Sequence, residues 1–274
     1  MYYRHNLKYD YPERSDGHMI TVKRIFKTNF DEKYPYYKKG FGVKFKRAAL
    51  FVFMNLIMFP LCTIRYGLRI HGRKNLKKYK EHFKDGAITV CNHVLMWDNI
   101  CVMKALRPHL PYVPVWSTNF EGPNGPFIRW GGGIPVPTHS MRAMASFQRG
   151  IEGVLDDKKW LHFFPEGSMW FYYPDIRPLK KAVFKFAVRY NRPVIPMTIS
   201  FRPCRGIYKI FGKKPLADLH IGEPVFPDKS LPQTEAIGKI QAEVYHIMQG
   251  MNGINPGVPT YNVDQNIDNY KKTM

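Results

Sequence analysis

The chain has 274 residues, of which 45% are hydrophobic, so it is long enough for one sizeable α/β domain with a small appendage. Lysine and arginine total 42 against 21 acidic residues, and the resulting net charge of +21 favours an anionic partner: a phospholipid surface, a nucleic acid or an acidic carrier protein. The four cysteines have no metal or disulfide spacing and the ten histidines no paired helical spacing, so the sequence indicates neither a metal centre nor an oxidising compartment.

Residues 1–47 are polar, basic and rich in tyrosine, and they predict a flexible lead-in. They do not form a signal peptide, because the first apolar run begins too late and lacks a clear cleavage site. That run, residues 48–64, is flanked by basic residues on both sides and interrupted by Asn55 and Pro60. As a helix it would be about 25 Å long, shorter than a hydrocarbon core of ~30 Å. We therefore expect a helix embedded in one leaflet, with a thin span or a buried core helix as alternatives.

The chain from residue 67 onward alternates between strand-like and helix-like segments. Strands are predicted at 87–91, 112–115, 134–136, 160–164, 194–201 and 219–222, and helices at 97–106, 142–155, 181–190 and 234–249. This order implies right-handed crossovers and an α/β fold whose central sheet, mainly parallel or mixed, is flanked by helices. We expect three parts: a lead-in with a membrane-associated helix (1–65), a domain (66–252) and a loosely ordered tail (253–274).

The first motif follows the strand at 87–91 and reads Asn92-His93, then Asp98 five residues after the histidine. In a continuous helix, residues five apart point about 140° apart, so His93 should lie in the loop and Asp98 in the first helical turn. There Asp98 could accept a hydrogen bond from one ring nitrogen and leave the other free to take a proton. Alternatively, His93 is a structural hydrogen bonder and Asp98 a helix cap.

The second motif, Phe164-Pro165-Glu166-Gly167-Ser168, follows the strand at 160–164. The carboxyl ends of parallel strands meet at one edge of a sheet, where α/β proteins usually bind ligands. Glu166 can therefore converge on the same edge as His93, where it would bind an acceptor's hydroxyl groups or hold a basic neighbour. Its alternative role is that of a turn residue.

The two motifs together resemble those of the glycerolipid acyltransferase family, which contains 1-acylglycerol-3-phosphate acyltransferase. Its His-x4-Asp motif matches His93 and Asp98, its Phe-Pro-Glu-Gly-Thr-Arg motif matches residues 164–167, and its later Val-Ile-Pro motif matches residues 194–196. The resemblance covers roughly residues 66–225. It implies that His93 is the general base, that Asp98 orients it, and that Glu166 and Gly167 lie around the acceptor.

This chain departs from the family pattern where an acceptor phosphate is expected to bind. Ser168-Met169 stands in place of Thr-Arg, and residues 137–139 (Pro-Thr-His) replace an Asp-Arg pair. Residues 176–214 form a basic run that has no acid, which could compensate for the missing arginines or could form a solvated or membrane-facing surface. The predicted substrate-binding residues are Asn92, Glu166, Gly167, Ser168, Arg177, Lys180, Lys181 and Arg142.

The resemblance implies transfer of an acyl chain from acyl-coenzyme A or acyl carrier protein to a lipid hydroxyl. The best candidate acceptor is a lysolipid, 1-acylglycerol 3-phosphate, which would give phosphatidic acid; other lysolipids and amphipathic alcohols are alternatives. A non-catalytic basic protein that binds membrane or nucleic acid is the rival from another class, and a hydrolase is disfavoured because no Gly-x-Ser-x-Gly elbow is present. We expect an anionic membrane surface as partner, no nucleic acid, no metal and no cofactor, and a peripheral or monotopic location on the cytoplasmic face of the cell membrane.

Overall fold

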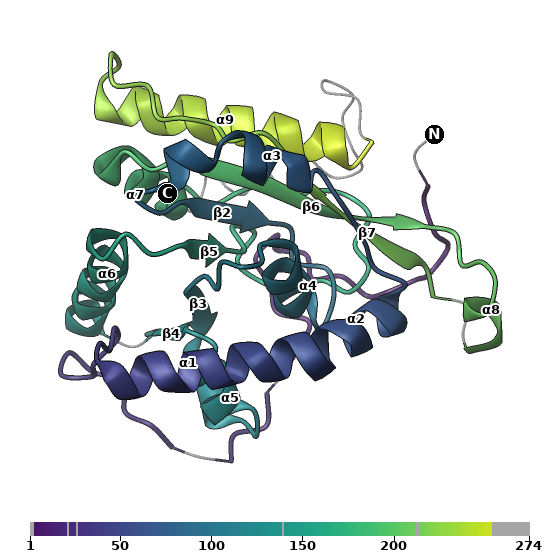
Figure 1. The fold of residues 1–274 in the computed structure, drawn as a ribbon, viewed down its shortest axis with the longest axis horizontal. Helices are drawn as coiled ribbons and strands as arrows, with labels where there is room; N and C mark the ends of the chain where they lie inside the picture. Colours follow the sequence, from purple (N-terminus) through teal and green to yellow (C-terminus); the bar gives the residue numbers. More distant parts are fainter. Residues whose placement is uncertain (1–2, 21, 26, 139, 212–213, 254–274) are drawn as a thin grey trace.

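A computed structural model describes residues 3–20, 22–25, 27–138, 140–211 and 214–253 of the chain. An extended N-terminal arm leads into a long helix, and an α/β domain follows it (Figure 1). The predicted loosely ordered tail lies outside the described residues, apart from Gly253.

The central sheet has five strands in the order β1 (Arg69–His71), β7 (Leu216–Ile221), β6 (Val194–Arg202), β2 (Ile88–Cys91) and β5 (Leu161–Phe163). β6 and β7 are antiparallel, and the other neighbouring pairs are parallel. β3 (Val113–Trp116) and β4 (Gly133–Val136) form a separate parallel pair, which a bridge between Tyr112 and Leu161 joins to β5. The prediction of a mainly parallel or mixed sheet is therefore confirmed.

Helices cover both faces of the sheet, which is why its inner strands β2 and β6 are buried along most of their length. In β2, Ile88 and Val90 pack with helices α6 (Met141–Asp156), α7 (Ala182–Tyr190) and α9 (Gln233–Met251). Cys91 points to the opposite face and packs with α4 (Asp98–Ala105) and α2 (Phe59–Tyr66). Figure 1 shows α9 on one side of the sheet and α2 on the other.

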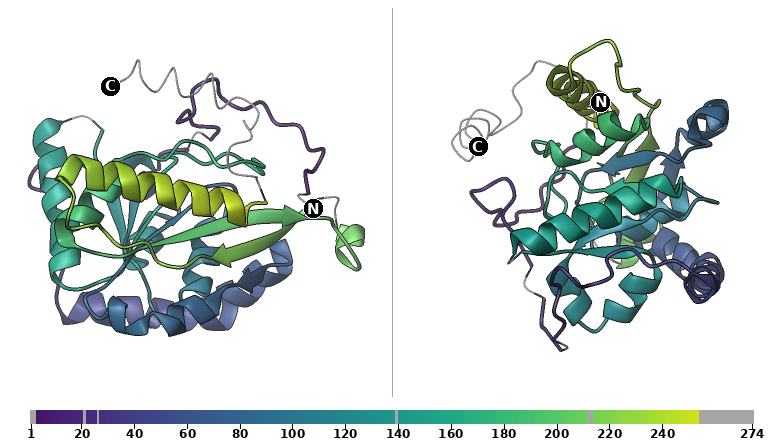
Figure 2. Two further views of the ribbon diagram at one scale, coloured as in Figure 1. Left: turned by 90° about the horizontal axis from the view of Figure 1, so that it is seen from above. Right: turned by 90° about the vertical axis from the view of Figure 1, so that its left-hand side faces the viewer.

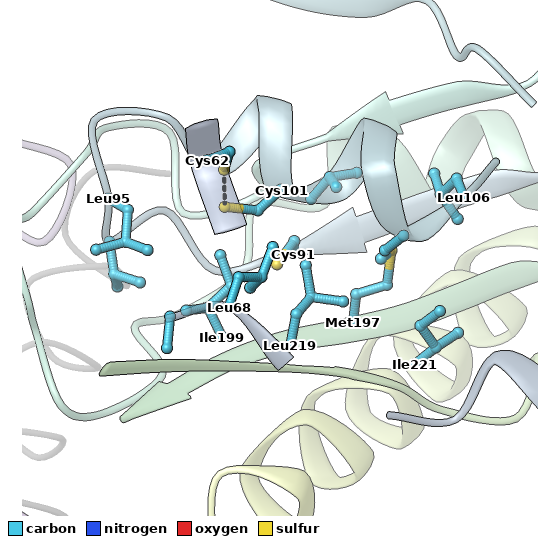
Figure 3. Packing of buried hydrophobic residues seen from close by; sticks show 14 of the residues in the cluster. Cys62, Leu68, Cys91, Leu95, Cys101, Leu106, Met197, Ile199, Leu219 and Ile221 are labelled. Atoms are coloured by element: carbon cyan, nitrogen blue, oxygen red, sulfur yellow. Dashed lines mark hydrogen bonds between the residues drawn. The ribbon is translucent and has the colours of Figure 1, made fainter. Parts of the chain in front are cut away.

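The core beneath α4 and α2 holds three buried free thiols (Figure 3). Cys62 of α2 and Cys101 of α4 face each other with their sulfur atoms 3.2 Å apart, and Cys91 lies in the same cluster. Contact with the other thiol and burial both raise the pKa of Cys101 well above its usual range, so it stays protonated. The predicted burial of Cys91 and Cys101 is confirmed.

The predicted apolar helix is longer than its apolar run. α1 (Phe41–Phe53), the π-helical turn η1 (Met54–Met58) and α2 follow one another without a break. Pro60 has no N–H to donate to the preceding turn and its ring crowds that turn, and a widened π turn stands directly before it. Asn55 is satisfied as well, because its amide donates to the Phe51 carbonyl at 2.7 Å and accepts from Arg107 at 2.9 Å.

One face of this long helix packs on the domain along its whole second half. Its residues Leu50, Met54, Phe59, Cys62 and Tyr66 are buried. Much of the remaining surface is apolar and exposed, with Phe41, Phe45, Val52, Phe53, Leu56, Ile57, Leu61 and Ile64 each at least 38% accessible. The segment Phe41–Tyr66 has a mean hydropathy of 1.8 in its most apolar window, so by length and composition it could cross a membrane.

Several short elements were not predicted from the sequence. They are β1, α3 (Arg73–Lys78), η2 (Lys80–Phe83), η3 (Ser117–Glu121), α5 (Gly125–Trp130) and α8 (Tyr208–Phe211). β7 also begins three residues before the predicted strand, because its ladder with β6 extends back to Leu216. Figure 2, seen from above, shows the beginning of the N-terminal arm and the α1–α2 helix on opposite sides of the molecule.

Candidate active site

His93 lies in the loop that leaves β2, and Asp98 is the first residue of α4. The Nδ1 atom of His93 is 2.5 Å from Oδ2 of Asp98. The same oxygen accepts the backbone N–H groups of Val94 at 3.1 Å and Leu95 at 3.3 Å. The Asp98 carboxylate therefore holds the backbone of residues 94–95 in a tight turn and fixes the direction of the His93 imidazole ring.

This hydrogen bond determines what the imidazole can do chemically. The Asp98 carboxylate only accepts, so the proton of the neutral ring lies on Nδ1 and Nε2 carries a lone pair. Within the described residues, no hydrogen bond involves Nε2 of His93. The Asp98 side chain is 2% exposed and that of His93 is 25% exposed, so the acid is inside and the base can be reached from outside. Such a pair can remove a proton from a bound hydroxyl group.

An aromatic ring supports the imidazole from below. Phe164 stacks on His93 with ring centroids 4.1 Å apart and an angle of 17° between the planes. Sequence reasoning quoted Phe164 as part of a motif but gave it no role at the site. Its position directly after β5, two residues before Glu166, was the available signal.

A second histidine lies beneath Phe164, and it does not titrate near neutral pH. His162 of β5 is fully buried, contacts the edge of Phe164, and pairs through Nδ1 with Oγ1 of Thr89 at 2.7 Å. Burial, together with the charge of His93, lowers the pKa of His162 to about 3. His162 is therefore a neutral structural residue that connects β2 with β5.

Glu166 joins the two motif loops. Its Oε2 accepts the backbone N–H of His93 at 3.0 Å and a proton of Arg177 Nη2 at 2.8 Å. Its Oε1 accepts the backbone N–H of Arg177 at 2.9 Å. Glu166 is buried. Of the two roles predicted for it, its contacts match that of holding a basic neighbour, here Arg177, rather than that of binding an acceptor's hydroxyl groups.

Arg177 is buried with Glu166, and its donors point into the protein. Nη1 donates to the carbonyl of Ser15 at 2.6 Å and to Oγ of Ser168 at 3.0 Å, and Nη2 also donates to the Ser168 carbonyl. The guanidinium lies over the Trp170 ring at 4.3 Å. The structure thus brings Arg177, Ser168 and Glu166 together, but it commits the Arg177 charge to internal partners.

The other predicted binding residues lie in different surroundings. Lys180 and Lys181 are exposed where the second loop enters α7, and the Lys180 side chain passes close to Gly167, whose φ is +86°. Arg142 is exposed in the first turn of α6 and has no hydrogen bond or ion pair with the other predicted residues. Asn92 is buried, and its side-chain amide donates to and accepts from the backbone of Ile199 at 2.9 and 2.7 Å.

The N-terminal arm covers the second motif loop, which runs from the end of β5 to the start of α7, although the sequence predicted that the arm is a flexible lead-in. The Gly17 carbonyl accepts the indole N–H of Trp170 at 2.8 Å, and Tyr11 donates to the carbonyl of Phe171 at 2.9 Å. Asp16 pairs with Lys180 at 3.2 Å. The tyrosine-rich composition that suggested a lead-in instead supplies rings for packing, as where Tyr11 stacks on Trp170.

The arm also brings a third histidine near His93. The ring of His18 stacks on Trp116 with centroids 4.3 Å apart. Burial is the largest cause that lowers the pKa of His18, and the charge of His93 is among the smaller ones. No pattern in the sequence connected His18 with residues 93–98. Among the described residues, no group of three or more His, Cys, Asp or Glu side chains could hold a metal ion.

A family model described as Acyltransferase matches residues 67–200, which contain both motifs. Among solved structures, the chain is similar to the crystal structure of the 1-acyl-sn-glycerophosphate (LPA) acyltransferase, PlsC, from Thermotoga maritima. The identity is 20%, the match covers 71% of this chain and 74% of that one, and the TM-score is 0.49. No curated protein matches the chain.

Proposed function

This chain belongs to the acyltransferase family, and from that premise we propose that it acylates a lipid hydroxyl group through His93. Nε2 of His93 takes the hydroxyl proton as the acceptor oxygen attacks the thioester carbonyl. A carbon–oxygen bond forms, the carbon–sulfur bond breaks, and the thiolate leaves and takes the proton from the imidazolium. The buried Asp98 carboxylate stabilises the positive charge that forms on the ring.

The observation that carries this proposal is the 2.5 Å contact between His93 Nδ1 and Asp98 Oδ2 at the carboxyl end of β2. It orients a base whose second nitrogen is free, and it does so inside the segment that matches the acyltransferase family. A non-catalytic basic protein has no need of a buried carboxylate aimed at a partly exposed histidine. The donor is an acyl thioester of coenzyme A or of acyl carrier protein.

We further propose 1-acylglycerol 3-phosphate as the acceptor, with its phosphate held by Lys181 and Lys180 rather than by Arg177. Arg177 supports this choice by its burial and its internal partners. Lys181 is exposed and has no ion pair within the described part of the chain. Lys180 is paired with Asp16, which a phosphate can displace from an exposed lysine.

The α1–α2 helix supports a monotopic attachment in one leaflet. A helix that crosses a bilayer alone is covered by lipid all round, whereas this one has buried residues from Leu50 to Tyr66. Its exposed apolar residues lie along the same length. A helix packed on a domain by one face and apolar on the other fits the interface of a membrane better than a full span. We place that membrane surface on the cytoplasmic side, where acyl thioesters are available.

The acceptor assignment is tested with the wild-type chain, acyl-coenzyme A, and either lysophosphatidic acid or a phosphate-free monoacylglycerol. We expect the phosphorylated lipid to be strongly preferred. Lys181→Met should raise the KM for the phosphorylated acceptor and leave the KM for the donor nearly unchanged. The matched control is Lys185→Met, an exposed lysine one turn further along α7. Equal acylation of the neutral lipid would assign the enzyme to another hydroxyl acceptor.

A further inference from the structure

A large basic cleft lies on another part of the molecule. It has a volume of about 970 Å³ and is bordered by α1, by η2, and by the loops that precede β3 and β5. Eight basic side chains line it: Lys38, Lys39, Lys44, Arg47, Lys80, Lys84, Lys158 and Lys159. Within the described residues, Asp157 is the carboxylate of the lining, so cations dominate this cleft.

Part of this positive charge is neutralised locally. Lys39 pairs with Asp157 at 2.8 Å, Lys158 pairs with Asp85 at 2.7 Å, and Lys84 pairs with Glu81 at 2.5 Å. Lys38, Lys44 and Lys159 have no ion pair with any residue that the structure describes. Like charges gathered in a concave site produce a positive potential, and an anionic group lowers the energy of that arrangement.

The walls of the cleft include large apolar rings. Phe83 and Trp160 are 7% and 6% exposed, and they contact each other with centroids 5.3 Å apart. Phe51 of α1 and the rings of Tyr37 and Tyr112 belong to the lining as well. Clefts of roughly 300–1,000 Å³ with apolar walls and a few convergent charges suit amphipathic organic ligands rather than free ions.

The cleft is separate from the candidate active site. Phe83 and Trp160 precede β2 and β5, whereas His93 and Glu166 follow the same strands. Figure 1 shows these two strands pointing the same way, so their starts and their ends lie at opposite edges of the sheet. A ligand in the cleft therefore does not meet the reacting atoms at His93.

The cleft borders the exposed apolar surface of α1. Lys44, Ala48 and Phe51 line it from one row of the helix. The adjacent row, one residue further round the helix, carries Phe41, Phe45 and Val52, which are 84%, 64% and 57% exposed. A molecule with its charged end among the lysines would therefore place its hydrocarbon part along that row.

We infer that this cleft binds one anionic phospholipid of the surrounding membrane, with its phosphate at Lys44 and Lys159 and its acyl chains along α1. The inference rests on the proposed attachment of α1–α2 to a membrane. The lipid in the cleft is distinct from the acyl acceptor. It would fix the depth and orientation at which the domain sits on the bilayer, because the headgroup lies at the level of the basic side chains.

The test uses the full-length wild-type protein in a neutral detergent, and native mass spectrometry counts the bound lipid. Phosphatidylglycerol should bind in preference to phosphatidylcholine. The double variant Lys44→Glu/Lys159→Glu should weaken phosphatidylglycerol binding by roughly tenfold or more. The matched control reverses Lys185 and Lys229, two exposed lysines outside the cleft, and should bind as the wild type does. Lys44→Gln/Lys159→Gln serves if the first variant does not fold, and should show a smaller loss in the same direction.

Two outcomes would overturn the inference. One is binding of phosphatidylglycerol by the cleft variants at wild-type affinity. The other is displacement of the lipid by millimolar inorganic phosphate or coenzyme A, which would assign the cleft to a soluble phosphate compound. Coenzyme A release is measured on the same samples. Lipid binding without acyl transfer would refute the proposed function alone, and transfer without selective lipid binding would refute this inference alone.

Discussion

The two loops that build the candidate active site are held in different ways. In the loop after β2, the hydrogen bonds of the Asp98 carboxylate to the His93 ring and to the backbone of Val94 and Leu95 all join residues within five positions of one another. In the loop after β5, Arg177 and Trp170 are held by Ser15 and Gly17, more than 150 residues away in the sequence. The pairing of Asp98 with His93 is therefore local, whereas the loop after β5 depends on the N-terminal arm.

This difference explains how the two loops can share one site. Glu166 reaches from the loop after β5 to the backbone N–H of His93, and in the same loop Phe164 stacks on the imidazole and Trp170 donates its backbone N–H to the His93 carbonyl at 2.9 Å. The long-range structure is thus connected to the local one by these contacts, of which the one through Glu166 is a buried carboxylate. In the proposed mechanism, the chemistry resides in the loop after β2. The residues proposed to hold the acceptor phosphate, Lys180 and Lys181, follow the loop that the arm covers.

The largest expected effect comes from breaking the connection between the loops. Glu166→Gln leaves the buried Arg177 charge without its carboxylate, and such a change costs about 3–5 kcal/mol of unfolding free energy. The control is Glu152→Gln, which breaks the 2.6 Å surface pair with Arg189 and should cost no more than about 1 kcal/mol. Urea denaturation of both variants measures the difference. A loss in Glu166→Gln as small as that in Glu152→Gln would show that the connection does not stabilise the fold.

A smaller, pH-dependent effect comes from His162, which joins the strands that carry the two loops. Its folded pKa of about 3 lies below the ordinary value of 6.5, so the unfolded chain binds the proton more readily. Its contribution to stability is complete above pH 6.5 and is lost as the pH falls toward 3, at about 1.4 kcal/mol per pH unit. His162→Gln should therefore flatten the stability profile between pH 6 and pH 4, whereas His82→Gln, at an exposed position, should not. Parallel profiles for the wild type and His162→Gln would contradict this reading.

The smallest expected effect concerns the arm. Asp16→Asn removes the carboxylate that pairs with Lys180 and leaves the backbone contacts of the arm in place. If Lys180 helps to hold the acceptor phosphate, the acceptor KM should fall by roughly two- to fivefold, as expected for an exposed ion pair. Steady-state kinetics with Asp10→Asn, an exposed residue of the same arm, is the control. An unchanged acceptor KM in Asp16→Asn would separate the arm from acceptor binding.

The first loop was predictable from the sequence because its geometry follows from spacing. Residues five apart cannot face each other within one helix, so His93 had to precede the helix that Asp98 begins. The sheet was predictable because strands that alternate with helices along a chain are joined by crossover connections, which place the strands parallel. The resemblance to a known family supplied the chemistry.

The second loop was not predictable, because its partners are distant in the chain. Nothing near Arg177 indicates that a serine carbonyl of the arm accepts its proton, and the expectation that Glu166 could hold a basic neighbour did not identify Arg177 as that neighbour. A run of basic residues looks the same in a sequence whether a member is buried and paired, as Arg177 is, or exposed, as Lys181 is. The arm itself was read as a flexible lead-in because its aromatic residues have no helical or strand period.

The central claim is that the local loop performs the chemistry, and coenzyme A release by His93→Ala tests it most directly. The assay uses acyl-coenzyme A with lysophosphatidic acid and compares the wild type, His93→Ala and Asp98→Asn, each shown to be folded by circular dichroism. General-base catalysis contributes about 10²–10⁴-fold, so His93→Ala should lower the rate at least 10²-fold and Asp98→Asn should also impair it. A folded His93→Ala variant that releases coenzyme A at nearly the wild-type rate would contradict the account.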